Sequence, residues 1–310
     1  MDKMTIIVAL VAATLRTATP LIFAGLGGVF SEKSGVVNIG LEGMMIMGAF
    51  FAVYGTKISD NPMIGVICAV LAGMAIALIH AFLSVHLKAD QVVSGTAINL
   101  FAAALTSFLI LKLFGKGGQT DSVIKMPYNP PHFLTDIPIL GKIISDINWF
   151  VIIALILVFV THFILNKTPL GLRIRSVGEH PKAADTMGIS VYKIRYLCVI
   201  LSGALAGLGG AALSIGITPL YREGMVAGRG FIALAAMIFG NWKPIGTMWA
   251  CFLFAFASSF EMLAQSFGWN LPSEFYSSIP YILTMFALAG FVGKTTAPLA
   301  DGTPYDKGEA

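Results

Sequence analysis

Long apolar stretches, separated by short polar breaks, recur along almost the whole chain of 310 residues. A helix that crosses a bilayer needs roughly 20 mostly apolar residues, and in lipid only helices and closed barrels satisfy their own backbone groups. The composition agrees, because 56% of the residues are hydrophobic, 12% are charged and the mean hydropathy is +0.82. A soluble domain carries about 25% charged residues. The sequence therefore predicts an all-α, polytopic transmembrane helical bundle with about eight to ten spans.

The limits of the spans follow from hydropathy and from the turn residues between stretches. Those with defined limits cover residues 4–30, 36–54, 63–87, 92–114, 149–165, 197–217, 245–267 and 275–292. The first contains Arg16 and Pro20, and it is either one long kinked span or a surface helix followed by a partial span. A further candidate, 225–240, would be a helix of about 24 Å, shorter than the ~30 Å hydrocarbon core. That segment is tilted, re-entrant or half of a broken span.

Basic residues set the expected orientation, because cytoplasmic loops carry the excess of Lys and Arg. The largest basic cluster lies between the fifth and sixth spans: Lys167, Arg173, Arg175, Lys182, Lys193 and Arg195. We expect one transmembrane domain, residues 1–293, with this cytoplasmic loop at 166–196 and a Pro-rich external loop at 115–148. Residues 294–310 would form a cytoplasmic tail. Four further lysines would share the cytoplasmic side: Lys33, Lys88, Lys243 and Lys294.

Several kinds of chemistry are excluded by the composition and by missing motifs. The formal charge of +4 is too small a surplus to imply a nucleic-acid partner. The five His residues are scattered over different segments, so we predict no metal site. Gly293-Lys294-Thr295 ends like a nucleotide-binding loop, but Leu288 stands where such a loop needs its first Gly. We expect neither catalytic residues nor a cofactor in this chain.

A short helix is predicted inside the basic loop, from residue 181 to residue 187. Pro181 suits the first helical position, and Gly188 suits the position just past the end. A helix of two turns is too short to cross a membrane. Its small apolar face and the charges that flank it are Ala183, Ala184 and Met187, with Lys182 and Asp185. The segment is either a docking site for a soluble partner or an ordinary surface connection.

Polar residues within the predicted spans need an explanation, since a charge at the bilayer centre costs roughly 2.5 to 3.5 kcal/mol. The candidates are pairs about one turn apart, which would share a helix face: Asn38 with Glu42, Thr96 with Asn99, and Glu261 with Gln265. They either line a polar pathway for a hydroxylated solute or tie helices together by hydrogen bonds.

The sixth predicted span is rich in small residues. Gly203 and Gly207 form a GxxxG motif, and Gly210 lies one step round the helix. Such spacing indicates a helix that packs closely against a neighbour. Because this span follows the basic loop directly, we hypothesise that it transmits movement of the short helix into the membrane.

Two separated motifs resemble one family of transport proteins. The first comprises Gly171-Leu172-Arg173, Arg175, Gly178, Pro181, Ala183-Ala184 and Gly188. It is similar to the coupling loop of ABC-importer permeases of the branched-chain amino acid, ribose and nucleoside type. The second comprises Thr19-Pro20-Leu21 and the stretch from Ser31 to Met45, SEKSGVVNIGLEGMM, which resembles the nucleoside and simple-sugar branch. The resemblance runs from about Thr19 to about Gly293, and the short N-terminus resembles the smaller of two paired permease chains.

The resemblance implies a permease subunit of an ATP-driven importer in a bacterial-type cell membrane, rather than an enzyme. Loop 166–196 would be the coupling loop, gripped by cytoplasmic ATP-binding subunits through Gly178, Glu179, Pro181, Lys182, Ala183, Ala184, Met187 and Gly188. The other implied partners are a second, related permease chain, an external solute-binding lipoprotein and membrane lipid. A nucleoside is the expected solute, and a simple sugar such as ribose is the alternative.

Two other function classes stay open on the residues alone, a single-chain ion-coupled carrier and a channel or scaffold. A carrier usually has midplane carboxylates and an internal repeat. Here Glu42 and Glu261 are the available span carboxylates, and residues 35–48 and 228–240 are only vaguely alike. Uptake by this chain alone on an ion gradient would indicate the carrier.

Overall fold

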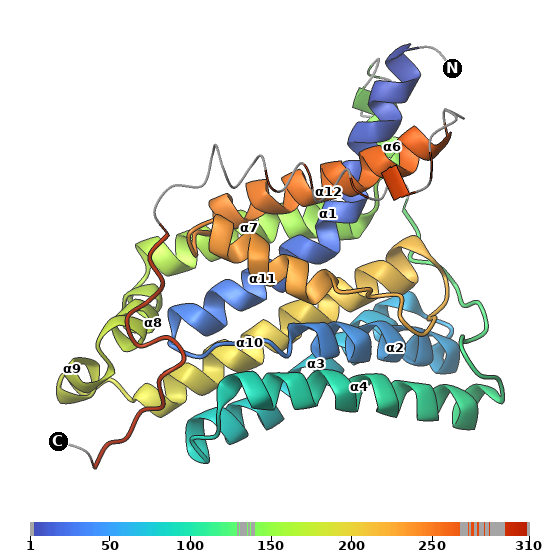
Figure 1. Ribbon diagram of the computed structural model, residues 1–310. Helices are drawn as coiled ribbons and strands as arrows, with labels where there is room; N and C mark the ends of the chain where they lie inside the picture. Colours follow the sequence, from blue (N-terminus) through green and yellow to red (C-terminus); the bar gives the residue numbers. More distant parts are fainter. Residues whose placement is uncertain are drawn as a thin grey trace.

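The computed structural model describes residues 3–128, 130, 135, 137, 140–266, 272, 274–275, 278, 282, 285 and 295–308. Within these ranges the chain is a bundle of α-helices with two π-helical turns, and one isolated bridge joins Gln119 to Arg222 (Figure 1). The helices are α1 (Lys3–Lys33), α2 (Leu41–Ser59), α3 (Pro62–Ala81), α4 (Gln91–Phe114), α6 (Leu140–Asp146), α7 (Trp149–Lys167), α8 (Pro169–Glu179), α9 (Pro181–Thr186), α10 (Val191–Ala211), α11 (Arg229–Phe239) and α12 (Pro244–Ser266). The π-helical turns η1 (Phe82–His86) and η2 (Ala212–Ile217) extend α3 and α10.

In the described part of the chain, 6 helical segments are long and apolar enough to cross a membrane. They are Ile6–Lys33, Pro62–His86, Gln91–Phe114, Trp149–Lys167, Val191–Ile217 and Pro244–Gln265. Each coincides with a span predicted from hydropathy. The first is a single helix that contains Pro20, so the alternative of a surface helix followed by a partial span is wrong. Most of the predicted span 275–292 lies outside the described residues.

Two predicted spans differ from the structure. Residues 36–40 are not helical, and α2 begins only at Leu41 and continues to Ser59, so the prediction of a helix over 36–54 is wrong at both ends. The predicted segment 225–240 contains α11, which has 11 residues. At 1.5 Å per residue that helix is about 16 Å long, shorter than we expected from the sequence and too short to cross a bilayer.

Helix α10 lies at the centre of the bundle, against α1, α2 and α3. Small residues make this packing possible, because a Cβ on Gly48 of α2 would lie only 2.5 Å from the Gly207 Cα atom. Gly203 and Gly207 also contact α3 at Gly73 and Ala69. Backbones that approach so closely bring many atoms into dispersion contact where lipid offers no hydrophobic driving force.

The loops gather at two opposite ends of the bundle (Figure 1). Helices α8 and α9 and the C-terminal segment lie at one end, and the N-terminus and α6 lie at the other (Figure 1). Lys88 reaches the first end, where it forms an ion pair with Asp306. Helix α8 is absent from our sequence prediction, although Thr168 caps it through a 3.2 Å bond to the Gly171 N–H and Pro169 occupies its first turn.

Candidate functional site

Helix α9 occupies the position predicted for the short helix in the basic loop. It runs from Pro181 to Thr186, Met187 caps its C-terminus, and Gly188 follows with a φ of +81°. A residue with a side chain rarely adopts that left-handed conformation, so Gly188 lets the chain turn into α10. The helix therefore stands as a separate single element between α8 and α10 at one end of the molecule (Figure 1).

The three apolar side chains of α9 do not share one face, which corrects the sequence prediction. Ala184 is only 4% exposed and packs in a small cluster with Val177, Val191 and Tyr305. Ala183 is exposed, and Met187 is 81% exposed. The physical reason is that α9 uses Ala184 to attach itself to α8 and α10. Its outward surface includes Lys182, Ala183 and Thr186, and Met187 is exposed next to them in the chain.

The C-terminal segment, Thr295–Gly308, lies against α8, α9 and α10, and we call it the tail. The Ala300 N–H donates to the Gly178 carbonyl at 2.9 Å, and the Leu299 N–H donates to the Glu179 carboxylate at 3.3 Å. Ion pairs join Lys307 to Asp185 and Lys88 to Asp306. The tail and α9 thereby enclose a groove of about 560 Å³.

We counted Arg195 in the basic loop between the fifth and sixth predicted spans, but the structure places it inside α10, which begins at Val191. Its side chain is only 1% exposed, and its guanidinium donates to the Thr303 carbonyl in the tail at 2.9 Å. The Asp301 carboxyl group lies close to Arg195 and to Glu32 at the end of α1. Burial raises the pKa of Asp301 from 3.8 to about 6, and the positive charges of Arg195 and Lys33 limit that rise. The hydrogen bond from the buried Arg195 therefore anchors the tail, whereas burial disfavours the charged form of Asp301.

A second group of polar residues surrounds the non-helical stretch before α2. Asn38 is fully buried, and its Nδ2 atom donates to Ser202 Oγ of α10 at 2.9 Å. The sequence analysis predicted that Asn38 and Glu42 share a helix face. That prediction is wrong, because Asn38 lies outside α2. The reason is that side chains from other helices bind this backbone and keep it out of the helix.

Side chains of α3 and α4 provide the hydrogen bonds that the backbone of this stretch lacks. His80 bridges the Val37 carbonyl and Ser94 Oγ, each at 3.0 Å, and Gln91 accepts from the Val37 N–H at 2.7 Å. Asn99 accepts from the Gly43 N–H at 2.7 Å. A non-helical backbone inside a membrane protein requires such partners. Our sequence analysis did not single out His80, although a His within an apolar span was a usable signal.

Glu42 binds the start of α11. Its two carboxylate oxygens accept the backbone N–H groups of Gly228 and Gly230 at 2.8 and 2.6 Å. The first turn of a helix has unpaired N–H groups and a partial positive charge, so a carboxylate there is stabilised. Glu42 therefore joins α2 to α11. Glu42 is 7% exposed and Gly230 is buried, so this contact lies in the interior of the protein.

The remaining polar candidates lie apart from this group. Thr96 is exposed, and its hydroxyl donates to the Val92 carbonyl of its own helix. Glu261 is half-buried near the end of α12, where the Gln265 amide contacts it at 3.5 Å. The structure thus brings Asn38, Glu42 and Asn99 to the break before α2 but leaves Thr96, Glu261 and Gln265 elsewhere.

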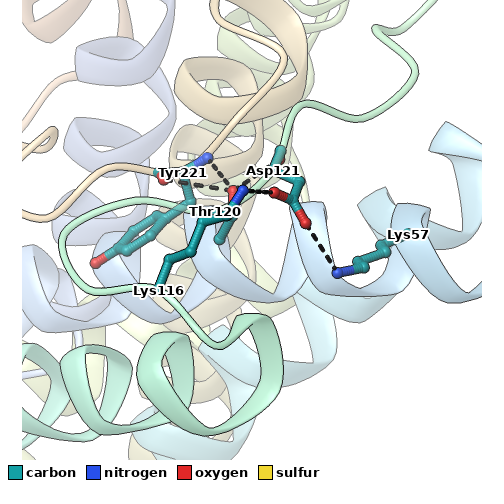
Figure 2. Close-up of polar contacts among 5 residues, drawn as sticks. All are labelled: Lys57, Lys116, Thr120, Asp121 and Tyr221. Atoms are coloured by element: carbon teal, nitrogen blue, oxygen red, sulfur yellow. Dashed lines mark hydrogen bonds and ion pairs between the residues drawn. The ribbon is translucent and has the colours of Figure 1, made fainter.

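The end of the molecule opposite α9 is tied together by a loop that follows α4. Figure 2 shows Asp121 between Lys116 and Lys57, at 2.7 and 3.3 Å, and the Thr120 N–H donates to the Tyr221 carbonyl at 2.9 Å. The two lysines lower the pKa of the exposed Asp121 carboxyl. These contacts hold the loop after α4 against the segment between η2 and α11.

Comparison with known proteins gives a match along most of the chain. Residues 10–288 match the family model for the permease component of the branched-chain amino acid transport system. The guanosine ABC transporter permease protein NupQ of Bacillus subtilis is 47% identical over 100% of both chains. The nucleoside ABC transporter permease protein NupC of Lactococcus lactis is 42% identical over 96% of both.

A more distant relative comes from the same organism as NupQ. The guanosine ABC transporter permease protein NupP of Bacillus subtilis is 27% identical, over 91% of this chain and 81% of its own length. The matches to NupQ and NupC and the family match cover far more than half of the chain. The chain is therefore a multi-pass cell-membrane protein that belongs to the family of branched-chain amino acid transport system permease components.

Proposed function

We propose that this chain is the smaller permease subunit of an ATP-driven nucleoside importer. The observation that carries the proposal is a helix of six residues, α9, which projects from one end of a membrane bundle with Ala183 and Met187 exposed. Relatives that match along the whole chain are named as guanosine and nucleoside ABC transporter permeases. The chain itself is a transport subunit, and ATP is hydrolysed on separate subunits.

The end that carries α8, α9 and the tail faces the cytoplasm in this proposal. The exposed Arg173, Lys182 and Lys193 support that orientation, because cytoplasmic loops carry the excess of basic residues. Residues 166–196 are then the coupling loop, which the ATP-binding subunit contacts at Glu179, Pro181, Lys182, Ala183, Met187 and Gly188. Gly178, which the sequence placed among these contacts, is buried, and its carbonyl accepts the Ala300 N–H, so its role is to hold the tail. Ala184 acts indirectly, by attaching α9 to the bundle.

Residues 1–293 form the transmembrane domain, with the external loop at 115–148 and the cytoplasmic tail at 294–310. Helix α11 is half of a broken span: it is too short to cross by itself, and the loop after it lies at the end that carries the tail, where the Thr296 N–H donates to Asn241. Besides the 6 membrane-spanning segments, α2, this broken span and the predicted span 275–292 bring the count to about nine, within the range expected from the ~20 residues per span.

Movement of α9 reaches the membrane interior through α10. Gly203, Gly207 and Gly210 let this helix contact α2 and α3 at backbone distance, so a shift of α10 displaces both. α2 in turn holds the start of α11 through Glu42. Asn38, Glu42 and Asn99 therefore act as ties that keep the helix break in place beside the solute pathway, and we assign no solute contact to Thr96, Glu261 or Gln265.

The complete importer contains a second, related permease chain and an external solute-binding protein. The pairing is supported by the guanosine permease proteins NupQ and NupP, two different chains of one organism that both match this sequence. A heterodimer of permease chains would place two coupling helices on the ATP-binding subunits.

Uptake into proteoliposomes tests the proposal. The chain is reconstituted with its partner permease and ATP-binding subunit, and vesicles loaded with ATP are given radiolabelled guanosine and the solute-binding protein. We expect guanosine uptake that stops when ATP or the ATP-binding subunit is left out. Unlabelled adenosine should compete with guanosine, and ribose should not. Guanosine uptake by this chain alone on a proton or sodium gradient would instead indicate a carrier, and competition by ribose would indicate a sugar permease.

A further inference from the structure

Three large apolar side chains are exposed at the end of the molecule that carries α9. Leu172 on α8, Met187 after α9 and Leu299 in the tail are 62%, 81% and 70% exposed. Many apolar side chains on the spans are also exposed, and lipid covers those in a membrane. The coupling loop and the tail lie beyond the spans, where lipid tails do not reach. Exposed apolar groups in that position indicate a surface that another protein covers.

The tail is a built part of this surface. Tyr305 is only 6% exposed and packs on Val177, Ala184 and Val191, the same cluster that holds α9. Its carbonyl accepts a hydrogen bond from Tyr192 at 3.4 Å. The tail therefore lies beside α9 as a second, fixed wall, as the course of the C-terminal segment past α8, α9 and α10 shows (Figure 1).

The space between the two walls is a groove of about 560 Å³. One wall comes from the end of α8 and from α9, and the other comes from the tail. Its lining includes Lys182 and Ala183 on the first wall and Leu299, Thr303 and Tyr305 on the second. Because both walls line the same space, a partner that covers this space contacts α9 and the tail together.

We propose that the ATP-binding subunit covers this groove and contacts the tail at Leu299 as well as Ala183 on α9 and the exposed Met187 that follows α9. This inference rests on the proposed function, and it adds a second binding segment, more than 100 residues away in sequence from the coupling loop. The tail then does two things. It supports α9 through the packing of Tyr305 on Ala184. It also supplies Leu299 as a contact for the ATP-binding subunit, which can reach α9 and Leu299 together only while the tail stays beside α9.

The charges around the groove define the chemistry of the docking partner. The exposed Lys182 lines the groove, and of the two carboxylates that line it Asp306 is paired with Lys88 and Glu179 accepts the Leu299 N–H. The groove thus has apolar side chains between charges of both signs. Complementary association requires an apolar surface on the ATP-binding subunit, with an acidic group placed to meet Lys182.

Retention of the ATP-binding subunit on the assembled transporter tests this inference. The variants Leu299→Asp, Met187→Asp and the control Ala297→Asp are each co-expressed with the partner permease and the ATP-binding subunit, and the complexes are purified through a tag on this chain. Ala297 is exposed in the same tail but does not line the groove. We expect Leu299→Asp and Met187→Asp to weaken retention by about tenfold, since each removes a buried apolar contact and adds a charge, and Ala297→Asp to retain the subunit.

The outcomes separate this inference from the proposed function. Loss of the subunit in Met187→Asp but full retention in Leu299→Asp overturns the role of the tail and leaves the importer function standing. Full retention in Met187→Asp contradicts the coupling role of α9 itself.

A cross-linking measurement guards against a variant that simply fails to fold. A cysteine replaces Leu299 and, as the control, Ile124, which is 52% exposed at the opposite end. A short thiol-to-amine cross-linker should join Leu299→Cys to the ATP-binding subunit and leave Ile124→Cys unlinked. Equal linkage in both variants, or none at Leu299→Cys, contradicts the docking surface.

Discussion

The Glu42 carboxylate on α2 accepts a 2.6 Å hydrogen bond from the backbone N–H of Gly230 at the start of α11. Its second oxygen accepts from Gly228, so one side chain closes the first turn of a helix almost 190 residues away in sequence, as the two bonds span 186 and 188 positions. Hydrogen bonds to a charged group are stronger than neutral ones, and a helix N-terminus strengthens them further.

Replacing Glu42 by Gln should therefore destabilise the protein. The amide keeps one acceptor oxygen but turns an NH₂ group toward a backbone N–H, so one charge-assisted bond becomes a repulsive contact. We expect a loss of about 1.5 to 3 kcal/mol in the free energy of unfolding, measured by chemical unfolding in detergent micelles. Glu261→Gln, in a half-buried carboxylate near the end of α12, is the matched control and should change stability by less.

Asn99 offers an isosteric test of the break before α2. Its Oδ1 accepts from the Gly43 N–H at 2.7 Å, and its Nδ2 donates to the Ile39 carbonyl at 3.0 Å. Asn99→Asp places a carboxylate oxygen against that carbonyl, and we expect a cost of about 1 to 3 kcal/mol together with reduced uptake. Thr96→Val, one turn away, removes a hydroxyl that bonds only within its own helix, so its thermal unfolding midpoint should stay close to that of the wild type. Equal midpoints for the two variants would contradict the role of Asn99.

Gly207 tests the central packing of α10. A Cβ at this position meets the backbone of α3 at Ala69 and Val70, which cannot move aside as a flexible side chain can. Gly207→Leu should insert into the membrane but give little uptake and a clearly lower thermal midpoint, because the two helices must separate. Ala204→Leu, on a half-buried position of the same helix, is the control for added volume. Normal uptake by Gly207→Leu would show that the close approach is dispensable.

The membrane spans were predictable from the sequence because hydropathy depends on composition over about 20 residues. Helix α4 begins at Gln91 and α7 begins at Trp149, each within a residue of the predicted start. Helix α9 was predictable for a local reason too, since Pro181 and Gly188 mark its two ends.

The parts that sequence reasoning missed depend on contacts between distant residues. Residues 36–40 read as a helix, because nothing local reveals that His80, Gln91 and Asn99 will bind their backbone. Arg195 was counted with the basic loop, because its acceptor, the Thr303 carbonyl, lies 108 positions away and nothing local shows that the two groups meet. Ala184 was predicted to share an apolar face with Ala183 and Met187, because the sequence does not reveal that Tyr305 of the tail packs on it.

Asp301 makes docking of the tail depend on pH. Its pKa is raised from 3.8 to about 6 when the tail is docked against Glu32, Arg195 and Lys33. The docked tail thus binds the proton more tightly than a released tail, so this contribution is complete below pH 3.8 and is lost as the pH rises through about 6. A nitroxide on Ala297→Cys should report a less mobile tail at pH 5 than at pH 8. Adding the second substitution Asp301→Asn should abolish the difference in mobility between the two pH values. If the difference stays the same, a group other than Asp301 causes it.

The central claim is that α9 couples ATP hydrolysis to transport, and the most direct test is ATP-driven guanosine uptake by the double variant Ala183→Asp, Met187→Asp. Both side chains are exposed, so the permease should assemble and run normally on size-exclusion chromatography. We predict that uptake into proteoliposomes containing the complete transporter falls to the level seen without ATP. Uptake at the wild-type rate by this variant would contradict the account.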